Sequence, residues 1–254
     1  MTTKQLVRAA GRGLAYSTGL AAGAYATYAA TTWLRYGKVR AGVGDDADAL
    51  LDGFIPLYEV VERHHAHVAA PARIAFAAAC EVDLQQSGLV RAIFKGRELM
   101  LGADSDVSAR PHGLLAVTTA LGWGVLAEIP GREIVVGAVT QPWKGNVVFR
   151  AVSSDEFAAF NEPDYAKIVW TLRADPIDAA TSIVRTETRV TTTDSGARRK
   201  FRRYWAVVSP GVEIIRRVGL MLTKADAERR ARTTMSGTVD RFNLASSGDL
   251  DPQC

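Results

Sequence analysis

Residues 181–208 read TSIVRTETRVTTTDSGARRKFRRYWAVV and change from a strand pattern to a helix pattern. In the first part, apolar and hydroxyl side chains alternate with charged ones, which predicts a β-strand with one buried face. Asp194 or Ser195 then offers a helix N-cap, and aromatic and aliphatic residues follow at steps of three and four, the spacing of an apolar helix stripe. We therefore expect a strand that leads into a long amphipathic helix, kinked or interrupted at Pro210 and Gly211.

The segments before this stretch carry further strand and helix signals. Pro71 suits the first turn of a helix, because its missing N–H is not needed there. Ser87 can cap a second short helix that Gly96 ends, and Pro130 with Gly131 marks a turn between strand patterns. The predicted strands cover residues 58–68, 123–128, 133–141, 146–150, 165–173 and 181–192, and the predicted helices before the long one cover residues 72–81 and about 87–96. This order predicts an α+β fold with an antiparallel sheet.

The composition indicates one globular domain with appendages. The chain has 254 residues, of which 48% are apolar, so it can bury a core and is not a disordered chain. The net charge of +4 says little about partners, although basic residues cluster at the start of the long helix: Arg198, Arg199, Lys200, Arg202 and Arg203. Such a cluster either meets an anion or forms the solvated face of a helix. Cys80 lies in an apolar run and Cys254 ends a polar tail, so no disulfide is expected.

The N-terminal segment, residues 1–40, contains an uncharged run of 22 residues from Gly13 to Leu34, with basic residues on both sides. A helix of that length spans a bilayer. We expect a membrane-associated protein with a single N-terminal helix and a cytoplasmic domain, since basic residues follow the run directly. Alanine, threonine and glycine dominate the run, so a cleaved signal peptide (a secreted protein) and a packed soluble helix (a cytoplasmic one) stay open. Gly19 and Gly23 form a GxxxG pair through which two chains could form a homodimer.

These patterns divide the chain into four parts. The hydrophobic segment, residues 1–40, comes first and is followed by a glycine- and aspartate-containing linker over residues 41–53. The globular domain covers residues 54–230. Residues 231–254 are polar and are expected to be a disordered tail.

Three stretches of the predicted domain resemble the SRPBCC superfamily of helix-grip proteins, which includes START-like lipid-transfer domains and polyketide cyclase/dehydrase-like proteins. Residues 68–76 (VAAPARIAF) resemble the strand-to-helix junction that opens this fold. Residues 130–137 (PGREIVVG) resemble its central hairpin. Residues 186–190 (TETRV) and the aromatic stripe behind them resemble its last strand and closing helix. The resemblance implies a curved antiparallel sheet wrapped on a long C-terminal helix.

The resemblance also implies an apolar cavity between the sheet and the closing helix. A long helix laid across a bent sheet does not fill all of the space at the mouth with side chains, so a pocket is natural there. Ordinary core packing stays the alternative for each lining candidate, because aromatic side chains dominate cores. The expected lining residues are Trp123, Trp170, Thr186, Thr188, Tyr204, Trp205 and Val208.

No motif in the sequence fixes a reaction. His64, His65 and His67 offer at most two ligands on one strand face, so no metal site is expected. No dinucleotide or phosphate-binding motif indicates a cofactor. Nucleic acid is not expected as a partner, because the aromatic residues beside the basic cluster are needed for the apolar stripe.

Three functions stay open at this point. The first hypothesis is that the protein binds or carries a hydrophobic small molecule or lipid in the cavity while tethered to the membrane. The alternative is a cyclase/dehydrase-type enzyme that acts on a polyketide-like substrate in the same cavity. A scaffold with a filled interior is the third. A buried, unpaired carboxylate or histidine in the cavity would favour the enzyme, and an apolar cavity would favour the binder.

Overall fold

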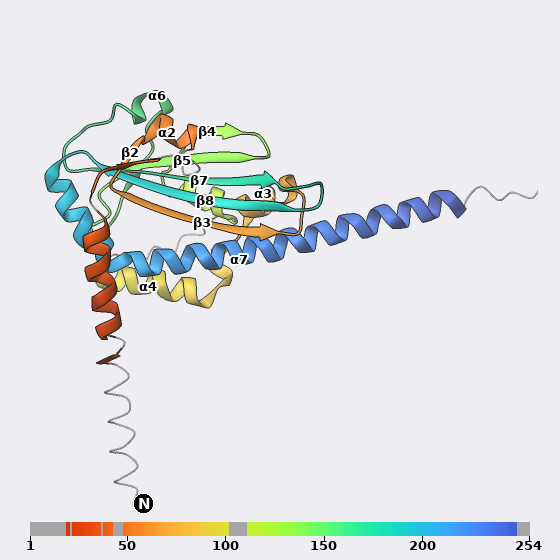
Figure 1. Cartoon of the computed structure of the whole chain (residues 1–254), viewed down its shortest axis with the longest axis horizontal. Coiled ribbons are helices and arrows are strands. Elements are labelled where there is room, and N and C mark those ends of the chain that lie inside the picture. Colours follow the sequence, from red (N-terminus) through yellow and green to blue (C-terminus); the bar gives the residue numbers. More distant parts are fainter. Residues whose placement is uncertain (1–18, 21, 37, 43–47, 102–110, 248–254) are drawn as a thin grey trace, which may run out of the picture.

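The computed structural model describes residues 19–247 except residues 21, 37, 43–47 and 102–110. Figure 1 shows an antiparallel sheet with a long helix, α7 (Ser195–Ser247), running along one of its faces. The order of elements is the predicted one, with strands, short helices, more strands and a closing helix. The predicted α+β helix-grip fold is therefore confirmed.

The main sheet has, within the described residues, six strands in the order β3-β8-β7-β5-β4, with β6 also paired to β5. All of its pairs are antiparallel. Thr186 lies opposite His64 on one neighbouring strand and Leu172 on the other, so these three side chains share the face toward α7. The strands are β1 (Arg40–Ala41), β2 (Leu57–Tyr58), β3 (Val60–Val68), β4 (Gly124–Ile129), β5 (Glu133–Thr140), β6 (Phe149–Arg150), β7 (Ala166–Pro176) and β8 (Ser182–Thr192), and β1 pairs only with β2.

Helices cover both faces of this sheet (Figure 1). On the α7 side lie α3 (Ala72–Glu81), η2 (Leu84–Gln86), α4 (Gly88–Leu101) and α5 (Leu114–Ala120), and on the other side lie α2 (Ala49–Phe54) and α6 (Ser154–Phe157). Ala75, Ala78 and Ala79 of α3 are completely buried, and their small side chains let the helix approach the sheet and α7 closely. Two features differ from the prediction: α4 continues past Gly96, and α5 falls where no element is predicted.

The closing helix begins where the sequence predicts. The Asp194 carboxylate accepts a hydrogen bond from the Ala197 N–H at 2.8 Å and so caps the helix. Pro210 lies inside α7, and the first turns run at an angle to the rest (Figure 1), because proline supplies no N–H to the helix ladder. Further on, α7 continues through most of the segment for which disorder is predicted. Ala227 and Ala231 are still buried in the core cluster that contains α3, which supports the helix past the sheet.

The predicted linker contains an ordered helix. The Asp48 carboxylate accepts hydrogen bonds from the N–H groups of Leu50 at 3.1 Å and Leu51 at 3.0 Å, which caps α2. Leu51 and Ile55 are completely buried in the cluster that covers the outer face of the sheet. The folded domain therefore begins before residue 54.

The prediction of a membrane-spanning N-terminal helix is wrong. In the part of the chain that the structure describes, no helix is long and apolar enough to cross a membrane. Instead, residues 22–35 form a helix beside the start of α7 (Figure 1). Tyr25 donates a hydrogen bond to the Val207 carbonyl, and the Arg202 guanidinium lies 4.2 Å from the centre of the Trp33 ring. The predicted membrane-associated location was based on this span and is therefore also wrong.

The homodimer contact expected at Gly19 and Gly23 stays a prediction. A Cβ atom built on either glycine meets nothing within 4 Å, so both positions are open on the helix surface. The beginning of the uncharged run lies outside the described residues.

Candidate functional site

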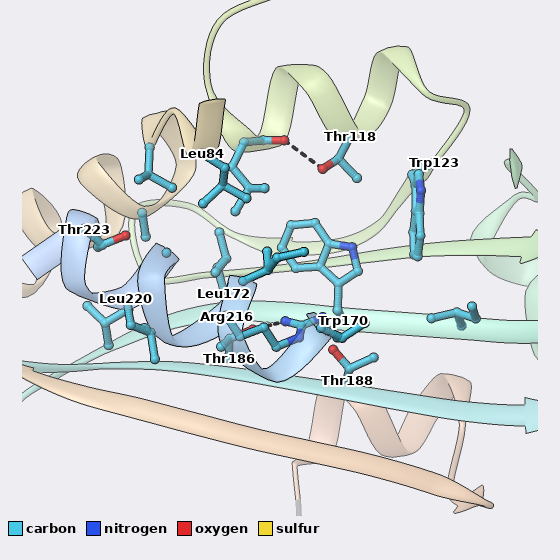
Figure 2. A pocket seen from close by; sticks show the side chains of 18 of the residues that line it. Leu84, Thr118, Trp123, Trp170, Leu172, Thr186, Thr188, Arg216, Leu220 and Thr223 are labelled. Carbon is cyan, nitrogen blue, oxygen red and sulfur yellow. Dashed lines mark hydrogen bonds between the residues drawn. The ribbon is translucent and has the colours of Figure 1, made fainter. Parts of the chain in front are cut away.

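A cavity of about 310 Å³ lies between the inner face of the sheet and the helices on its α7 side (Figure 2). This volume is at the small end of the range of about 300–1,000 Å³ that is typical of ligand pockets. The lining residues are Ala79, Val82, Leu84, Phe94, Leu114, Thr118, Trp123, Ile168, Trp170, Leu172, Val184, Thr186, Thr188, Val212, Ile215, Arg216, Gly219, Leu220 and Thr223.

The sheet supplies the floor of the cavity. Alternate residues of a strand point to the same face, so Trp170 and Leu172 of β7 stand beside Thr186 and Thr188 of β8 (Figure 2). Trp123, just before β4, meets Trp170 edge-on with the ring centroids 6.5 Å apart. The floor is therefore aromatic and aliphatic along β7 and carries two hydroxyl groups along the neighbouring strand β8.

The part of α7 after Pro210 supplies one wall. Val212, Arg216, Gly219 and Thr223 recur at steps of three and four, so they lie on one face of the helix. Gly219 lets α7 lie close to Leu84, since a Cβ atom at this position would be only 3.2 Å from a methyl group of Leu84.

The short helices close the opposite side. Thr118 of α5 donates its hydroxyl hydrogen to the Leu114 carbonyl at 2.7 Å, so its polarity is satisfied within its own helix. Phe94 of α4 lines the cavity and is 39% exposed. Leu84, Leu114 and Phe94 make this side apolar.

Among the described residues, Arg216 is the charged side chain that lines the cavity. Arg216 donates from Nη1 to the Thr186 hydroxyl at 2.9 Å, and Figure 2 shows its side chain between α7 and the sheet, beside Trp170. Burial lowers the pKa of Arg216 to about 10, with the Glu62 carboxylate acting in the opposite sense. The guanidinium therefore stays charged at neutral pH. Its Nε and the Thr188 hydroxyl are both shielded from solvent and have no hydrogen-bond partner among the described residues.

Glu62 and His64 of β3 stand beside this arginine on the same face of the sheet. The Tyr36 hydroxyl donates to Glu62, and the His64 Nε2 lies 3.8 Å from the other oxygen of that carboxylate. Burial raises the pKa of Glu62, and burial together with the charge of Arg216 lowers the pKa of His64. Neither residue lines the cavity itself.

The structure brings together four of the seven residues expected to line the cavity. Trp123, Trp170, Thr186 and Thr188 all line it. Tyr204, Trp205 and Val208 instead belong to the packed cluster around Phe201, Tyr36 and Val60, where Trp205 stacks on Phe201 with the centroids 5.8 Å apart.

Sequence reasoning missed Arg216 and the rest of the α7 wall. A sequence signal for this wall was present. The inward face of α7 after Pro210 carries glycine, threonine and an arginine, and the small side chains among these leave space unfilled beside the sheet. The basic cluster at the start of α7 is largely used within the fold, with Arg198 on Glu59 at 3.0 Å and Lys200 on Asp164 at 2.6 Å. His65 and His67 sit on the opposite face of β3 from His64, with ring centroids 6.2 Å apart.

Comparison with known proteins finds a low similarity to solved structures. The sequence matches no protein-family model and no curated protein. Among solved structures, a di-domain aromatase/cyclase from the BE-7585A biosynthetic pathway is 17% identical with a TM-score of 0.28, and the match covers 66% of this chain and 46% of that one. The chain thus spans less than half of that protein.

Two further solved structures match over nearly their whole length. Norcoclaurine synthase from Thalictrum flavum is 11% identical with a TM-score of 0.31, and the match covers 67% of this chain and 96% of that one. An aromatase/cyclase from a Streptomyces species is 14% identical with a TM-score of 0.27, with 67% and 94% covered. At these identities and TM-scores the matches say nothing about ligand or reaction. The strand order and the closing helix of this chain are those of the helix-grip fold that the sequence predicts.

Proposed function

We propose that this protein binds an apolar small molecule in the cavity between the sheet and the second part of α7. The observation that supports this most strongly is the cavity itself, which has a volume of about 310 Å³ and a lining of mainly aliphatic and aromatic side chains. Removing apolar surface from water drives binding in such a site, and the few polar groups orient the ligand.

The lining favours binding over acid–base catalysis. Its polar members in the described chain are threonines and Arg216, with no carboxylate or imidazole among them. A general base near neutral pH is most often histidine or a carboxylate. The cyclase/dehydrase alternative would have to recruit Glu62 or His64, which stand next to the cavity and do not line it.

Titration with a neutral fluorescent probe, N-phenyl-1-naphthylamine, tests this proposal. We expect saturable binding to the full chain and, in native mass spectrometry, loss of any co-purified molecule when the probe is added. Ile215→Trp places an indole ring in the cavity from the α7 wall, so the probe affinity should fall at least about tenfold, or roughly 1.4 kcal/mol.

Ile214→Trp is the matched control. Ile214 is the neighbouring residue on the same helix, is 38% exposed and does not line the cavity, so this variant should bind the probe as the wild-type protein does. Absence of saturable binding to the wild-type protein, or equal affinity in both tryptophan variants, would exclude the cavity as the binding site.

A further inference from the structure

Arg216 is the charged residue among the cavity-lining side chains of the described chain. The other lining residues are apolar, glycine or threonine. A cation beside so much apolar surface is unfavourable unless it gains hydrogen bonds and a counter-charge, because it has lost part of its hydration. Arg216 therefore needs further hydrogen-bond acceptors and a negative charge close to its guanidinium.

Two carboxylates near Arg216 in the fold, Glu62 and Glu213, interact with other side chains. Glu62 influences it through space, and no carboxylate among the described residues forms an ion pair with its guanidinium. Glu62 accepts the hydroxyl hydrogen of Tyr36. Glu213, one turn earlier on α7, pairs with Arg217 at 2.7 Å. The chain thus leaves Arg216 with an attraction to negative charge that no direct ion pair satisfies.

Two buried polar groups beside the cavity, the Nε of Arg216 and the hydroxyl of Thr188, also lack a hydrogen-bond partner among the described residues. The Thr186 hydroxyl holds Nη1 of Arg216 at 2.9 Å and fixes the position of the guanidinium. Arg216 and Thr188 converge on the same end of the pocket, next to Trp170 (Figure 2).

We infer that the ligand of this cavity carries one anionic oxygen group, of which a carboxylate is the simplest, bound by Arg216 and Thr188, with its apolar body along Trp170 and Leu172. This inference rests on the proposed function and adds the chemical class of the ligand. A guanidinium presents a fork of N–H donors that matches a carboxylate, and such charge-assisted bonds are stronger than neutral ones. The apolar remainder of the pocket accepts an aliphatic or aromatic body without further polar partners.

Isothermal titration with decanoate and 1-decanol, which share one alkyl chain, tests the inference. The wild-type protein should bind decanoate more tightly than decanol. Arg216→Met keeps a similar side-chain length without charge, and it should weaken decanoate binding about 10- to 100-fold while decanol binding changes less than about threefold. Arg217→Met, the adjacent arginine with an exposed side chain, is the matched control and should leave both affinities unchanged.

Glu62→Gln provides a test with the opposite sign. Removing this carboxylate removes a negative charge that acts on Arg216, so decanoate should bind several-fold more tightly while decanol binding stays constant. A residue with only a structural role would not separate the two probes in this way. Arg216→Lys keeps the charge and should retain a preference for the acid, which covers the case in which Arg216→Met fails to fold.

The outcomes separate the two proposals. If both probes bind and Ile215→Trp blocks them, yet Arg216→Met and Glu62→Gln leave the ratio of their affinities unchanged, the cavity binds apolar molecules and the anionic group is excluded. If neither probe binds to the wild-type protein although N-phenyl-1-naphthylamine does, the anionic-group inference is also overturned. If none of the three binds, the proposed function itself fails.

Discussion

Two consecutive parts of α7, on either side of Pro210, meet the same sheet in different ways. Before Pro210, Phe201 stacks on Trp205, and Tyr36 meets Trp205 edge-on with the centroids 6.1 Å apart, so the space is filled. After Pro210, the helix presents glycine, threonine and branched aliphatic side chains and leaves a cavity of about 310 Å³. The difference shows that side-chain volume along one helix decides which part of a helix-grip domain is core and which is a site.

Charge divides the two parts in the same way. In the first part, Arg198 pairs at 3.0 Å with Glu59, a buried carboxylate that also accepts the Thr192 hydroxyl hydrogen at 2.7 Å. In the second part, Arg216 has the Thr186 hydroxyl and no direct ion pair in the described chain. The buried carboxylate beside the first part thus has a cationic partner within the protein, whereas the guanidinium of Arg216 has no carboxylate partner among the described residues.

The largest expected effect concerns packing. Phe201→Ala removes a nearly fully buried ring from the filled part, so the free energy of unfolding should fall by about 3–5 kcal/mol. Ile215→Ala removes a side chain that already borders empty space and therefore loses fewer contacts, so its loss should be about 1–2 kcal/mol. Urea unfolding monitored by circular dichroism measures both. Equal losses in the two variants would mean that the two parts of α7 pack alike.

An effect of opposite sign is expected for the two arginines. Arg198→Met leaves Glu59 without its counter-charge and should lower the free energy of unfolding by about 1–2 kcal/mol, a value reduced by the partial exposure of this pair. Arg216→Met replaces an unpaired cation by an apolar chain and should raise the stability of the ligand-free protein by about 1 kcal/mol.

Delipidated protein and urea unfolding at neutral pH measure this pair of changes. Arg217→Met, on the exposed side of the second part, should have almost no effect and serves as the control. Destabilisation by Arg216→Met as large as that by Arg198→Met would mean that Arg216 is a structural residue with an ion pair of its own.

Most of the fold could be predicted from the sequence because most of its elements carry their own periodic pattern. The alternation over residues 181–192 and the capping residue Asp194 predict β8 and the start of α7 closely. The predicted membrane helix failed because an uncharged run of sufficient length does not supply enough apolar surface when alanine, threonine and glycine dominate it. The missed helix α5 is a short apolar run between two segments with clearer patterns, so periodicity alone does not separate it from a strand.

The site was readable only in part. Trp170, Thr186 and Thr188 follow from strand alternation, which fixes the face of each residue. Tyr204 and Trp205 lie on the same face of α7 as the residues of the cavity wall. Periodicity predicts this face, but it does not predict where along the helix the packed core ends and the cavity begins. Arg216 was hidden for a different reason: an arginine on a helix is usually solvated, and only the tertiary contact with Thr186 turns it inward.

The smallest expected effect is a pH dependence from Glu62 and His64, the two titratable residues of β3 beside the second part of α7. Burial raises the pKa of Glu62 above its ordinary value of 4.5, Arg35 and Arg216 oppose this, and Glu213 adds to it. Because the folded state holds this proton more tightly than the unfolded state, Glu62 contributes stability below pH 4.5 that is lost as the pH rises through the folded pKa. His64, whose pKa is lowered, acts in the opposite sense, with stability that is present above 6.5 and lost as the pH falls.

Glu62→Gln isolates the first of these contributions, since it leaves His64 in place. The variant should gain stability relative to the wild-type protein as the pH rises above 4.5, and the gain should level off once Glu62 is fully ionised in the folded wild-type protein. Glu162→Gln, at a largely exposed carboxylate on the surface, should not show this rise. Urea unfolding across pH 4–8 measures both curves. If the difference in the free energy of unfolding between Glu62→Gln and the wild-type protein does not change with pH, Arg35 and Arg216 already neutralise this carboxylate. The charges beside the second part of α7 would then be balanced as they are beside the first.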